Sequence, residues 1–189
     1  MTEELTLALK KAQQIFADAD CLINEEQVSA AFDRMAEDVT AELGERLPLI
    51  FSVMNGGLFA TSELVKRLKF PLEMDYMHAT RYRMETKGGE LDWRVSPQVC
   101  LKDRYVLVVD DILDEGATLA AIMEYCRAQG AAGVYSAVLV DKKHDRKAFP
   151  DLKASFTGLE VEDRFLFGCG MDFQGYFRNL PAIYAPQGL

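Results

Sequence analysis

The N-terminal part of the chain carries two stretches in which apolar residues recur at intervals of three and four. This spacing gathers the apolar side chains on one face of a helix, so it predicts two amphipathic helices that pack against a core. Asn24 is suited to cap the second helix, with Gln27 as its reciprocal partner, and Gly44 is suited to end it. The apolar faces comprise Leu5, Ala8, Leu9, Ala12, Ile15 and Phe16 in the first helix, and Val28, Ala31, Phe32, Met35, Val39 and Leu43 in the second.

After the second helix the period changes to one in which apolar runs of strand length alternate with helical patterns. Such alternation predicts an α/β fold with a central parallel sheet flanked by helices, and a ligand site at the carboxyl ends of the strands. The polar, glycine-bearing stretch from Arg81 to Asp92 is predicted to be a long loop, with Trp93 as the anchor of its end. The predicted strands are 48–54, 72–79, 105–109, 134–140, 156–161 and 165–167, and the predicted helices between them begin near Leu58 and Ala117.

A length of 189 residues suits one domain, since a chain of this size can bury most of its apolar surface without disulfides or a structural metal. We therefore expect a single domain over residues 1–189. Its core is predicted at about 46–145, and a small hood or lid is predicted from the N-terminal residues together with about 150–189.

The composition narrows the class of protein. A hydrophobic share of 49% and a charged share of 27% are typical of a globular protein, and no run approaches the ~20 apolar residues that cross a bilayer. The net charge of −9, without a basic run, argues against a nucleic-acid partner. The four cysteines contain no C-x-x-C pair that would favour a zinc site. We expect a cytoplasmic protein with reduced thiols, no membrane partner and small-molecule substrates.

The most informative stretch is residues 106–119, which read VLVVDDILDEGATL. An apolar strand delivers Asp110 and Asp111 at its end, where both can reach one polyol or metal-bound ligand. Asp114 follows on a turn. Glu115, Gly116, Ala117 and Thr118 then lie at a helix N-terminus, where free backbone N–H groups and the helix dipole bind phosphate. Recognition of a diol beside a phosphate indicates a phosphorylated sugar.

Two other classes of protein also end an apolar strand in paired aspartates. Nucleotide hydrolases use such a pair to hold Mg²⁺, but they also need a G-x-x-x-x-G-K-[ST] loop, which this sequence lacks. In phosphoacceptor domains the acidic pair lies earlier in the chain, and that interpretation leaves the Gly56-Gly57 turn unexplained.

Residues 106–119 resemble the phosphoribosyl-pyrophosphate signature of the type I phosphoribosyltransferases. Three further stretches resemble the hypoxanthine-guanine branch of that family, and the resemblance covers nearly the whole chain from Leu22. It implies the type I phosphoribosyltransferase fold and a purine salvage reaction that joins hypoxanthine or guanine to phosphoribosyl pyrophosphate, with Mg²⁺, to give IMP or GMP and pyrophosphate. The three stretches are MNGG at 54–57, LVDKK at 139–143 and EDRFLFGCGMDFQGYFRNLP at 162–181.

The resemblance also implies how the sugar phosphate is bound. Asp110 and Asp111 would bind the ribose hydroxyls and, together with Asp172, the metal. The 5′-phosphate would lie on Glu115, Gly116, Ala117 and Thr118, and the diphosphate on Asn55, Gly56, Gly57 and Arg178. In relatives a cis peptide often precedes the residue that is Asn55 here.

Three positions depart from the family pattern. Asp110 stands where many relatives have Glu, Asn55 where many have Lys or Arg, and Glu115 where Thr or Ser is commoner. Asn55 can contribute no charge, although the adjacent glycines still allow an amide cradle. A carboxylate facing a phosphate would be repelled, so we expect the Glu115 side chain to point away from it.

For the purine, the resemblance implies that Lys142 donates to the six-position oxygen. Phe165 would stack on the base, and the backbone carbonyl of Leu166 would accept the two-position amine of guanine, with Asp172 nearby. Asp114 would act as the catalytic base that takes the imidazole proton. Arg81 and Tyr82 would form a lid that keeps water out.

Two alternatives stay open at this point. One is a regulator of the same fold that senses phosphoribosyl pyrophosphate while binding RNA or DNA, although the charge of −9 disfavours it. The other is an enzyme of the same fold that prefers another base, such as xanthine; Lys142 favours 6-oxopurines, since an ammonium group is a donor only. By resemblance we expect a homodimer or homotetramer. No role is assigned to His78 or His144.

Overall fold

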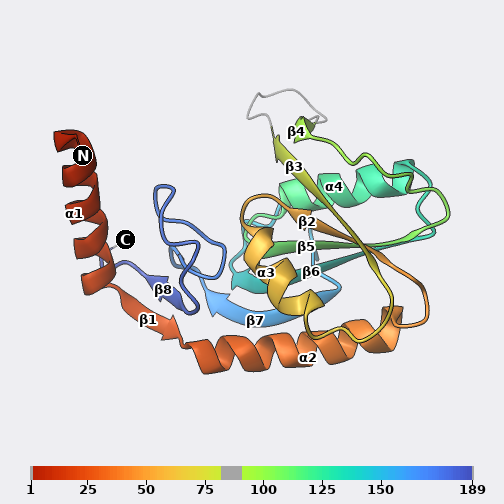
Figure 1. The fold of residues 1–189 in the computed structure, drawn as a ribbon, viewed down its shortest axis with the longest axis horizontal. Helices are drawn as coiled ribbons and strands as arrows, with labels where there is room; N and C mark the ends of the chain where they lie inside the picture. Colours follow the sequence, from red (N-terminus) through yellow and green to blue (C-terminus); the bar gives the residue numbers. More distant parts are fainter. Residues whose placement is uncertain (1, 82–90, 189) are drawn as a thin grey trace.

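A six-stranded sheet forms the centre of the fold in the computed structural model, which describes residues 2–81 and 91–188 (Figure 1). The strand order is β4-β3-β2-β5-β6-β7. All neighbours pair in parallel except β3 and β4, which are antiparallel. The strands are β2 (Leu49–Val53), β3 (Glu73–Arg81), β4 (Leu91–Val95), β5 (Tyr105–Leu113), β6 (Gly133–Lys143) and β7 (Phe156–Glu162).

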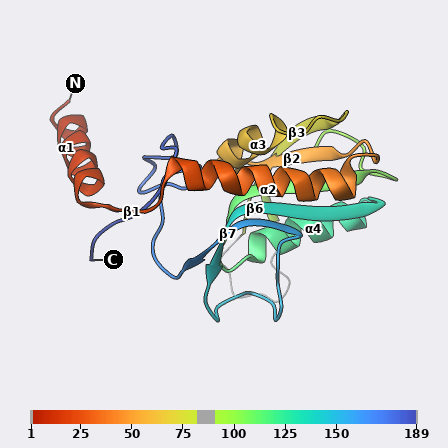
Figure 2. The same ribbon diagram turned by 90° about the horizontal axis from the view of Figure 1, so that it is seen from below.

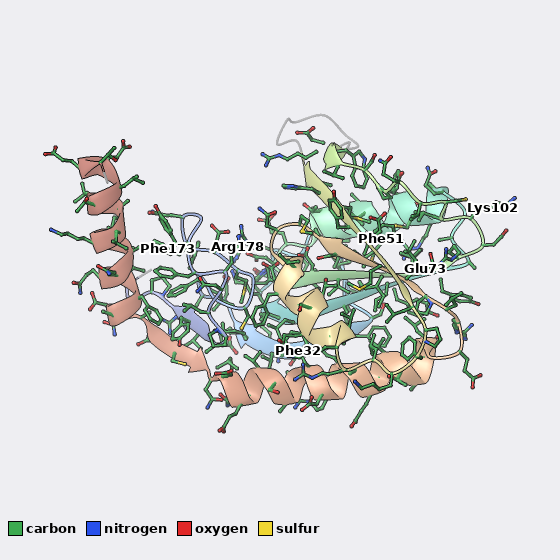
Figure 3. All side chains as sticks on the ribbon, viewed as in Figure 1. Phe32, Phe51, Glu73, Lys102, Phe173 and Arg178 are labelled. Atoms are coloured by element: carbon green, nitrogen blue, oxygen red, sulfur yellow. The ribbon has the colours of Figure 1, made fainter. Side chains whose placement is uncertain are left out.

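Helices cover both faces of this sheet, as the alternating pattern predicted. α2 (Glu25–Leu43) and α3 (Gly57–Val65) pack on one face, and α4 (Ala117–Ala128) packs on the other (Figure 2). Each face has its own apolar core, because successive residues of a buried strand point to opposite sides. Phe32 of α2 belongs to one core and Phe51 of β2 to the other, and both are fully buried (Figure 3).

The second helix begins as predicted. The Gln27 backbone N–H donates to Asn24 Oδ1 at 2.9 Å, and the Asn24 N–H donates to Gln27 Oε1 at 2.9 Å, which completes a capping box. Gly44 is its C-cap. The predicted apolar face of α2 is buried from Val28 to Leu43.

The first helix, α1 (Glu3–Asp18), does not pack into the core, and that prediction is wrong. Leu5 and Leu9 of the predicted apolar face are 57% and 46% exposed, and Ala12 is the one buried residue of the helix. α1 stands away from the sheet (Figure 1), and near its end Phe16 packs edge-on against Tyr184, with ring centroids 5.2 Å apart. A helical period shows which face is apolar but does not show what covers that face.

The two ends of the chain meet in a small two-stranded sheet beside the main one (Figure 1). β1 (Asp20–Ile23) pairs antiparallel with β8 (Ile183–Ala185). The predicted strand at 165–167 does not form, since Phe167 makes only an isolated bridge with Tyr184. The pairing partners here are β1 with β8 and Phe167 with Tyr184, and β1 and β8 lie too far apart in the sequence to be matched from periodicity.

The strands near the predicted loop also differ from expectation. Met77 and Ala79 of β3 are buried, whereas Met74 and Tyr76 on the opposite side of the strand are 53% and 47% exposed. β4 was not predicted, and its Trp93 packs on Tyr125 of α4 with ring centroids 4.8 Å apart. Most of the predicted loop, residues 82–90, lies outside the described residues. Among the helices that the structure does describe, none combines the length and apolar character needed to span a membrane.

Candidate active site

Asp110 and Asp111 lie where β5 extends beyond its neighbour β2. The paired register of these two strands ends at Ser52 and Val109, so the last residues of β5 have only β6 beside them. The Asp111 backbone N–H donates to Asp110 Oδ1 at 2.9 Å. The acidic pair therefore belongs to the strand itself, which is longer than predicted, and it faces the turn that follows β2.

The surroundings of both carboxyl groups disfavour their charged form. Burial raises the pKa of Asp110 well above its ordinary value, and the charge of Asp111 raises that pKa further. Burial also raises the pKa of Asp111, while Arg178 lowers the pKa of both in part. Hydroxyl donors or a cation would relieve this cost, because each stabilises the charged form of a carboxylate.

Three glycines lie against the end of β5 that carries the acidic pair. A Cβ atom on Gly56 would overlap the Asp111 carboxylate, and one on Gly170 would overlap the carbonyl oxygen of Gly56. A Cβ atom on Gly57 would meet the Val109 carbonyl oxygen at 2.5 Å. The backbone can therefore approach the acidic pair only because these positions lack side chains. The Met54–Asn55 peptide is cis, as the resemblance implied, and Asn55 is exposed.

The predicted phosphate turn lies at the N-terminus of α4. Gly116 is the N-cap, in the left-handed conformation with φ +79°, and α4 begins at Ala117. No side chain caps this end of the helix, so its first N–H groups are available to an anion. Thr118 belongs to the first turn, and Glu115 is exposed.

Asp114 lies in a cluster of charged groups. Lys142 Nζ is 3.1 Å from Asp114 Oδ2 and 3.2 Å from Asp163 Oδ1, and Lys142 is only 7% exposed. His144 Nε2 is 2.7 Å from Asp114 Oδ1. Partial burial alone would raise the pKa of Asp114, but hydrogen bonds from Lys142 and His144 outweigh it, so the pKa lies below its ordinary value.

Among the described residues, one group of three potential metal ligands has its ligand atoms within 4.8 Å of one another, namely Asp114, His144 and Asp163. The ammonium group of Lys142 already lies against both carboxylates of this group. A metal ion there would be repelled by that charge, so we interpret the cluster as an ion-pair network. The predicted ligands Asp110, Asp111 and Asp172 form no such group by themselves in the described part of the chain.

Arg178 lies on the C-terminal segment (Figure 3), and its charge lowers the pKa of both members of the acidic pair. Its Nη1 donates to the Gly170 carbonyl at 2.6 Å, and its Nη2 forms an ion pair with Asp172. The Gly175 backbone N–H donates to Asp172 at 2.7 Å. The charge of Arg178 thus acts on both Asp110 and Asp111, although these residues are far apart in sequence.

The predicted purine contacts lie on the segment that follows β7. Phe165 is 46% exposed, with its edge against Phe173 at a centroid distance of 5.4 Å, whereas Leu166 is buried. Asp163, the partner of Lys142, lies two residues before Phe165. Of the predicted lid pair, Tyr82 lies outside the described residues, and Arg81 is described only as the last residue of β3.

Four residues of this site were not predicted from the sequence. His144 contacts Asp114, and Arg146 forms a two-contact ion pair with Asp163. Lys147 Nζ lies 2.7 Å from the Leu113 carbonyl oxygen and 2.8 Å from that of Asp114. One signal was available, because His144, Arg146 and Lys147 directly follow the strand that carries Lys142, and Asp163 lies within the matched 162–181 stretch.

Known proteins similar to this chain are phosphoribosyltransferases. A family model described as a phosphoribosyl transferase domain matches residues 19–174. The hypoxanthine-guanine phosphoribosyltransferase of Bacillus subtilis is 34% identical over 163 residues, which cover 86% of this chain and 89% of that protein. The hypoxanthine-guanine-xanthine phosphoribosyltransferase of Tritrichomonas foetus is 30% identical over 86% of this chain and 88% of its own length.

A crystal structure of a hypoxanthine phosphoribosyltransferase from Staphylococcus aureus superimposes with a TM-score of 0.84 at 26% identity. The superposition covers 91% of this chain and 94% of that one. The fold is therefore that of the type I phosphoribosyltransferases, with α1 preceding the part that the family model matches. The family model matches residues 19–174, and a member of the family is 34% identical over 86% of the chain. The chain therefore belongs to the phosphoribosyl transferase family.

Proposed function

We propose that the protein transfers the phosphoribosyl group of phosphoribosyl pyrophosphate to hypoxanthine or guanine, to give IMP or GMP and pyrophosphate in purine salvage. One observation carries the proposal. Half-buried Asp110 and buried Asp111 lie at one end of β5, where the charge of Arg178 acts on both, and the pair formed by Lys142 and Asp114 lies beside the same strand end. A site for an activated sugar therefore adjoins a donor and an acceptor suited to a purine. The relatives named for hypoxanthine and guanine support the same activity.

Binding of the sugar phosphate follows from the chemistry of these groups. The ribose hydroxyls would donate to Asp110 and Asp111, which relieves the cost of their buried charges. The 5′-phosphate would accept N–H groups from residues 115–118 at the start of α4. The diphosphate would lie against the amides of Gly56 and Gly57, with the guanidinium of Arg178 opposing its charge.

Mg²⁺ fits the acidic side of this site. Asp110 and Asp111 offer adjacent carboxylate oxygens, the ligand type that Mg²⁺ prefers together with substrate phosphates. Burial raises the pKa of both groups, so a bound cation would relieve the cost of their charged forms. We propose that these residues, with Asp172, hold the metal together with oxygens of the substrate. When bound, the metal supplies charge neutralisation for the departing pyrophosphate.

The purine would be held between a ring and two polar groups. Phe165 offers an exposed aromatic ring on which the base can stack, and the Leu166 carbonyl can accept the amine of guanine. Lys142 has three donors, of which Asp114 and Asp163 use two, so one remains for the six-position oxygen.

The reaction then exchanges one bond at the sugar for another. A ring nitrogen of the purine forms a bond to the anomeric carbon as the bond to the pyrophosphate oxygen breaks, and the imidazole proton passes to the Asp114 carboxylate. Charge that develops on the pyrophosphate is opposed by Arg178 and by the amides of Gly56 and Gly57.

Four sequence predictions stay predictions beside this proposal. They are the lid formed by Arg81 and Tyr82, a homodimer or homotetramer, a cytoplasmic location, and one domain over 1–189 with a core at about 46–145 and a hood from the N-terminal residues and about 150–189. Within those bounds, β7 pairs in the central sheet and α2 packs on it, so the segments beside the sheet are narrower than that division. A preference for xanthine is the alternative for the base, because the T. foetus relative is also named for xanthine and Lys142 suits any purine with an oxygen at position six. A regulator that binds phosphoribosyl pyrophosphate without turnover is the alternative from another class.

The test is a spectrophotometric assay of the purified protein with Mg²⁺, phosphoribosyl pyrophosphate and each of hypoxanthine, guanine, xanthine, adenine and uracil. We expect turnover of hypoxanthine and guanine and none of adenine. Calorimetric binding of phosphoribosyl pyrophosphate without turnover of any base would favour the regulator. Absence of that binding at millimolar concentration, with Mg²⁺ supplied, would refute both.

A further inference from the structure

His144 makes two hydrogen bonds that the proposed reaction does not yet use. Its side chain, in the loop after β6, is only 3% exposed. Nε2 lies 2.7 Å from Asp114 Oδ1, and Nδ1 accepts the backbone N–H of Arg146 at 3.0 Å. Because Nδ1 is an acceptor, the ring hydrogen of a neutral His144 lies on Nε2 and is donated to Asp114.

We propose that His144 is a positioning residue that fixes the orientation of the Asp114 carboxylate, and this inference rests on the proposed function, in which Asp114 is the base. Lys142 holds one carboxylate oxygen and His144 holds the other, so together they fix the rotation of the carboxylate plane. Each oxygen keeps a second lone pair, which leaves room for the purine proton.

Lys142 and His144, the two donors to Asp114, would differ in their contacts once a purine is bound. Lys142 also has to reach the six-position oxygen of the base, so its hydrogen bond to Asp114 is shared with the substrate. His144 has both ring nitrogens engaged by the protein and almost no exposed surface, so it has no free nitrogen for the substrate. It is therefore the donor whose hold on Asp114 does not depend on the base, and it is not itself the base.

The main chain of Asp114 is held independently by the same loop. Lys147 Nζ donates to the carbonyl oxygens of Leu113 and Asp114, and the Ala148 backbone N–H donates to the Glu115 carbonyl at 2.8 Å. With the backbone fixed, the torsions of the Asp114 side chain are the freedom that remains. His144 restricts that freedom, and its second hydrogen bond, to the Arg146 N–H, belongs to the loop, so a variant that keeps only the bond to Asp114 is needed to separate the two contributions.

The experiment compares steady-state kinetics of three variants with the wild type, using phosphoribosyl pyrophosphate, Mg²⁺ and hypoxanthine. His144→Leu removes both hydrogen bonds and should lower kcat about 10- to 100-fold, as expected for a misplaced catalytic group, with both KM values within about twofold. His144→Gln keeps a side-chain amide donor for Asp114 and should recover kcat to within about threefold of the wild type. Lys143→Gln is the matched control, because Lys143 is an exposed neighbour that pairs with Glu160, and its kinetics should not change.

Two results would overturn the positioning role. One is an unchanged kcat in His144→Leu. The other is an equal loss of kcat in His144→Leu and His144→Gln, accompanied by a matching fall in their melting temperatures, which would indicate that His144 only stabilises the fold. A double-mutant cycle gives a second check: in an Asp114→Asn background, His144→Leu should cause no further loss, and a fully additive loss would also overturn the proposal. A wild-type protein that turns over none of the five bases would instead defeat the proposed function, so the two failures are distinguishable.

Discussion

Replacing Lys142 with methionine would remove one ammonium group from the cluster around Asp114 while leaving a side chain of similar length. In the structure that ammonium lies 3.1 Å from Asp114 and 3.2 Å from Asp163. The variant therefore tests the charge and the hydrogen-bond donor, with little change in packing.

The expected loss can be worked out from these contacts. A hydrogen bond to a charged donor contributes about 1.5–3 kcal/mol, so losing the donor to the six-position oxygen should lower kcat/KM for hypoxanthine and guanine about 10- to 150-fold. Stability should change by less than about 1 kcal/mol, because Asp114 keeps His144, Asp163 keeps Arg146, and water screens both carboxylates, which are 45% and 34% exposed.

The pH dependence should move in a definite direction. Lys142 and His144 hold the pKa of Asp114 below its ordinary value of 3.8, against partial burial, which raises it. The base works as a carboxylate, so activity is lost as pH falls through that pKa. Without Lys142 the pKa rises, and the acid limb of kcat/KM should therefore appear at a higher pH than in the wild type.

The measurement is kcat/KM for each base from about pH 3 to about pH 8, a range that extends below the ordinary pKa of an aspartate, so that a shift of the acid limb to higher pH can be seen. Lys143→Met serves as the control, since it removes an ammonium group that pairs with Glu160 at the surface. If Lys142→Met retained the wild-type kcat/KM for hypoxanthine and the same acid limb, the role assigned to Lys142 would be refuted.

Three further predictions concern the rest of the site. Asp114→Asn should lower kcat about 100- to 10,000-fold with phosphoribosyl-pyrophosphate affinity nearly unchanged, as single-turnover kinetics and calorimetry would show; unchanged turnover would exclude Asp114 as the base. The pKa of Asp110 is raised by burial and by Asp111, so its carboxyl group favours folding at low pH and loses that contribution as pH rises through the folded-state pKa. Asp110→Asn should therefore raise the Tm at pH 7, about 2–4 °C for each 1 kcal/mol, with the gain shrinking toward pH 4; a lower Tm at pH 7 would contradict this. Gly170→Ala places a Cβ atom against the Gly56 carbonyl at a φ of +102° and should destabilise the protein by about 1–3 kcal/mol while weakening phosphoribosyl-pyrophosphate binding, and a wild-type melting curve would count against it.

The sequence alone predicted the features that depend on residues close together in the chain. The capping box at Asn24 and Gln27 formed as expected, because its partners are three residues apart. The buried strands also lie where continuous apolar runs placed them, since a strand covered on both faces needs apolar residues at every position. The glycine start of α4 at Gly116 was likewise readable from residues 110–118, and so was the turn at Gly56 and Gly57 from residues 54–57.

Only the tertiary structure decided which distant groups meet. The period of α1 marks an apolar face, yet the sheet is already covered by α2, α3 and α4, so that face stays largely exposed. His144 received no role from the sequence, because its partner Asp114 is thirty positions away and the two are joined only where β5 and β6 end side by side. Short-range periodicity and turn chemistry are local, whereas the pairing of strands and the convergence of charged side chains depend on the free energy of the whole fold.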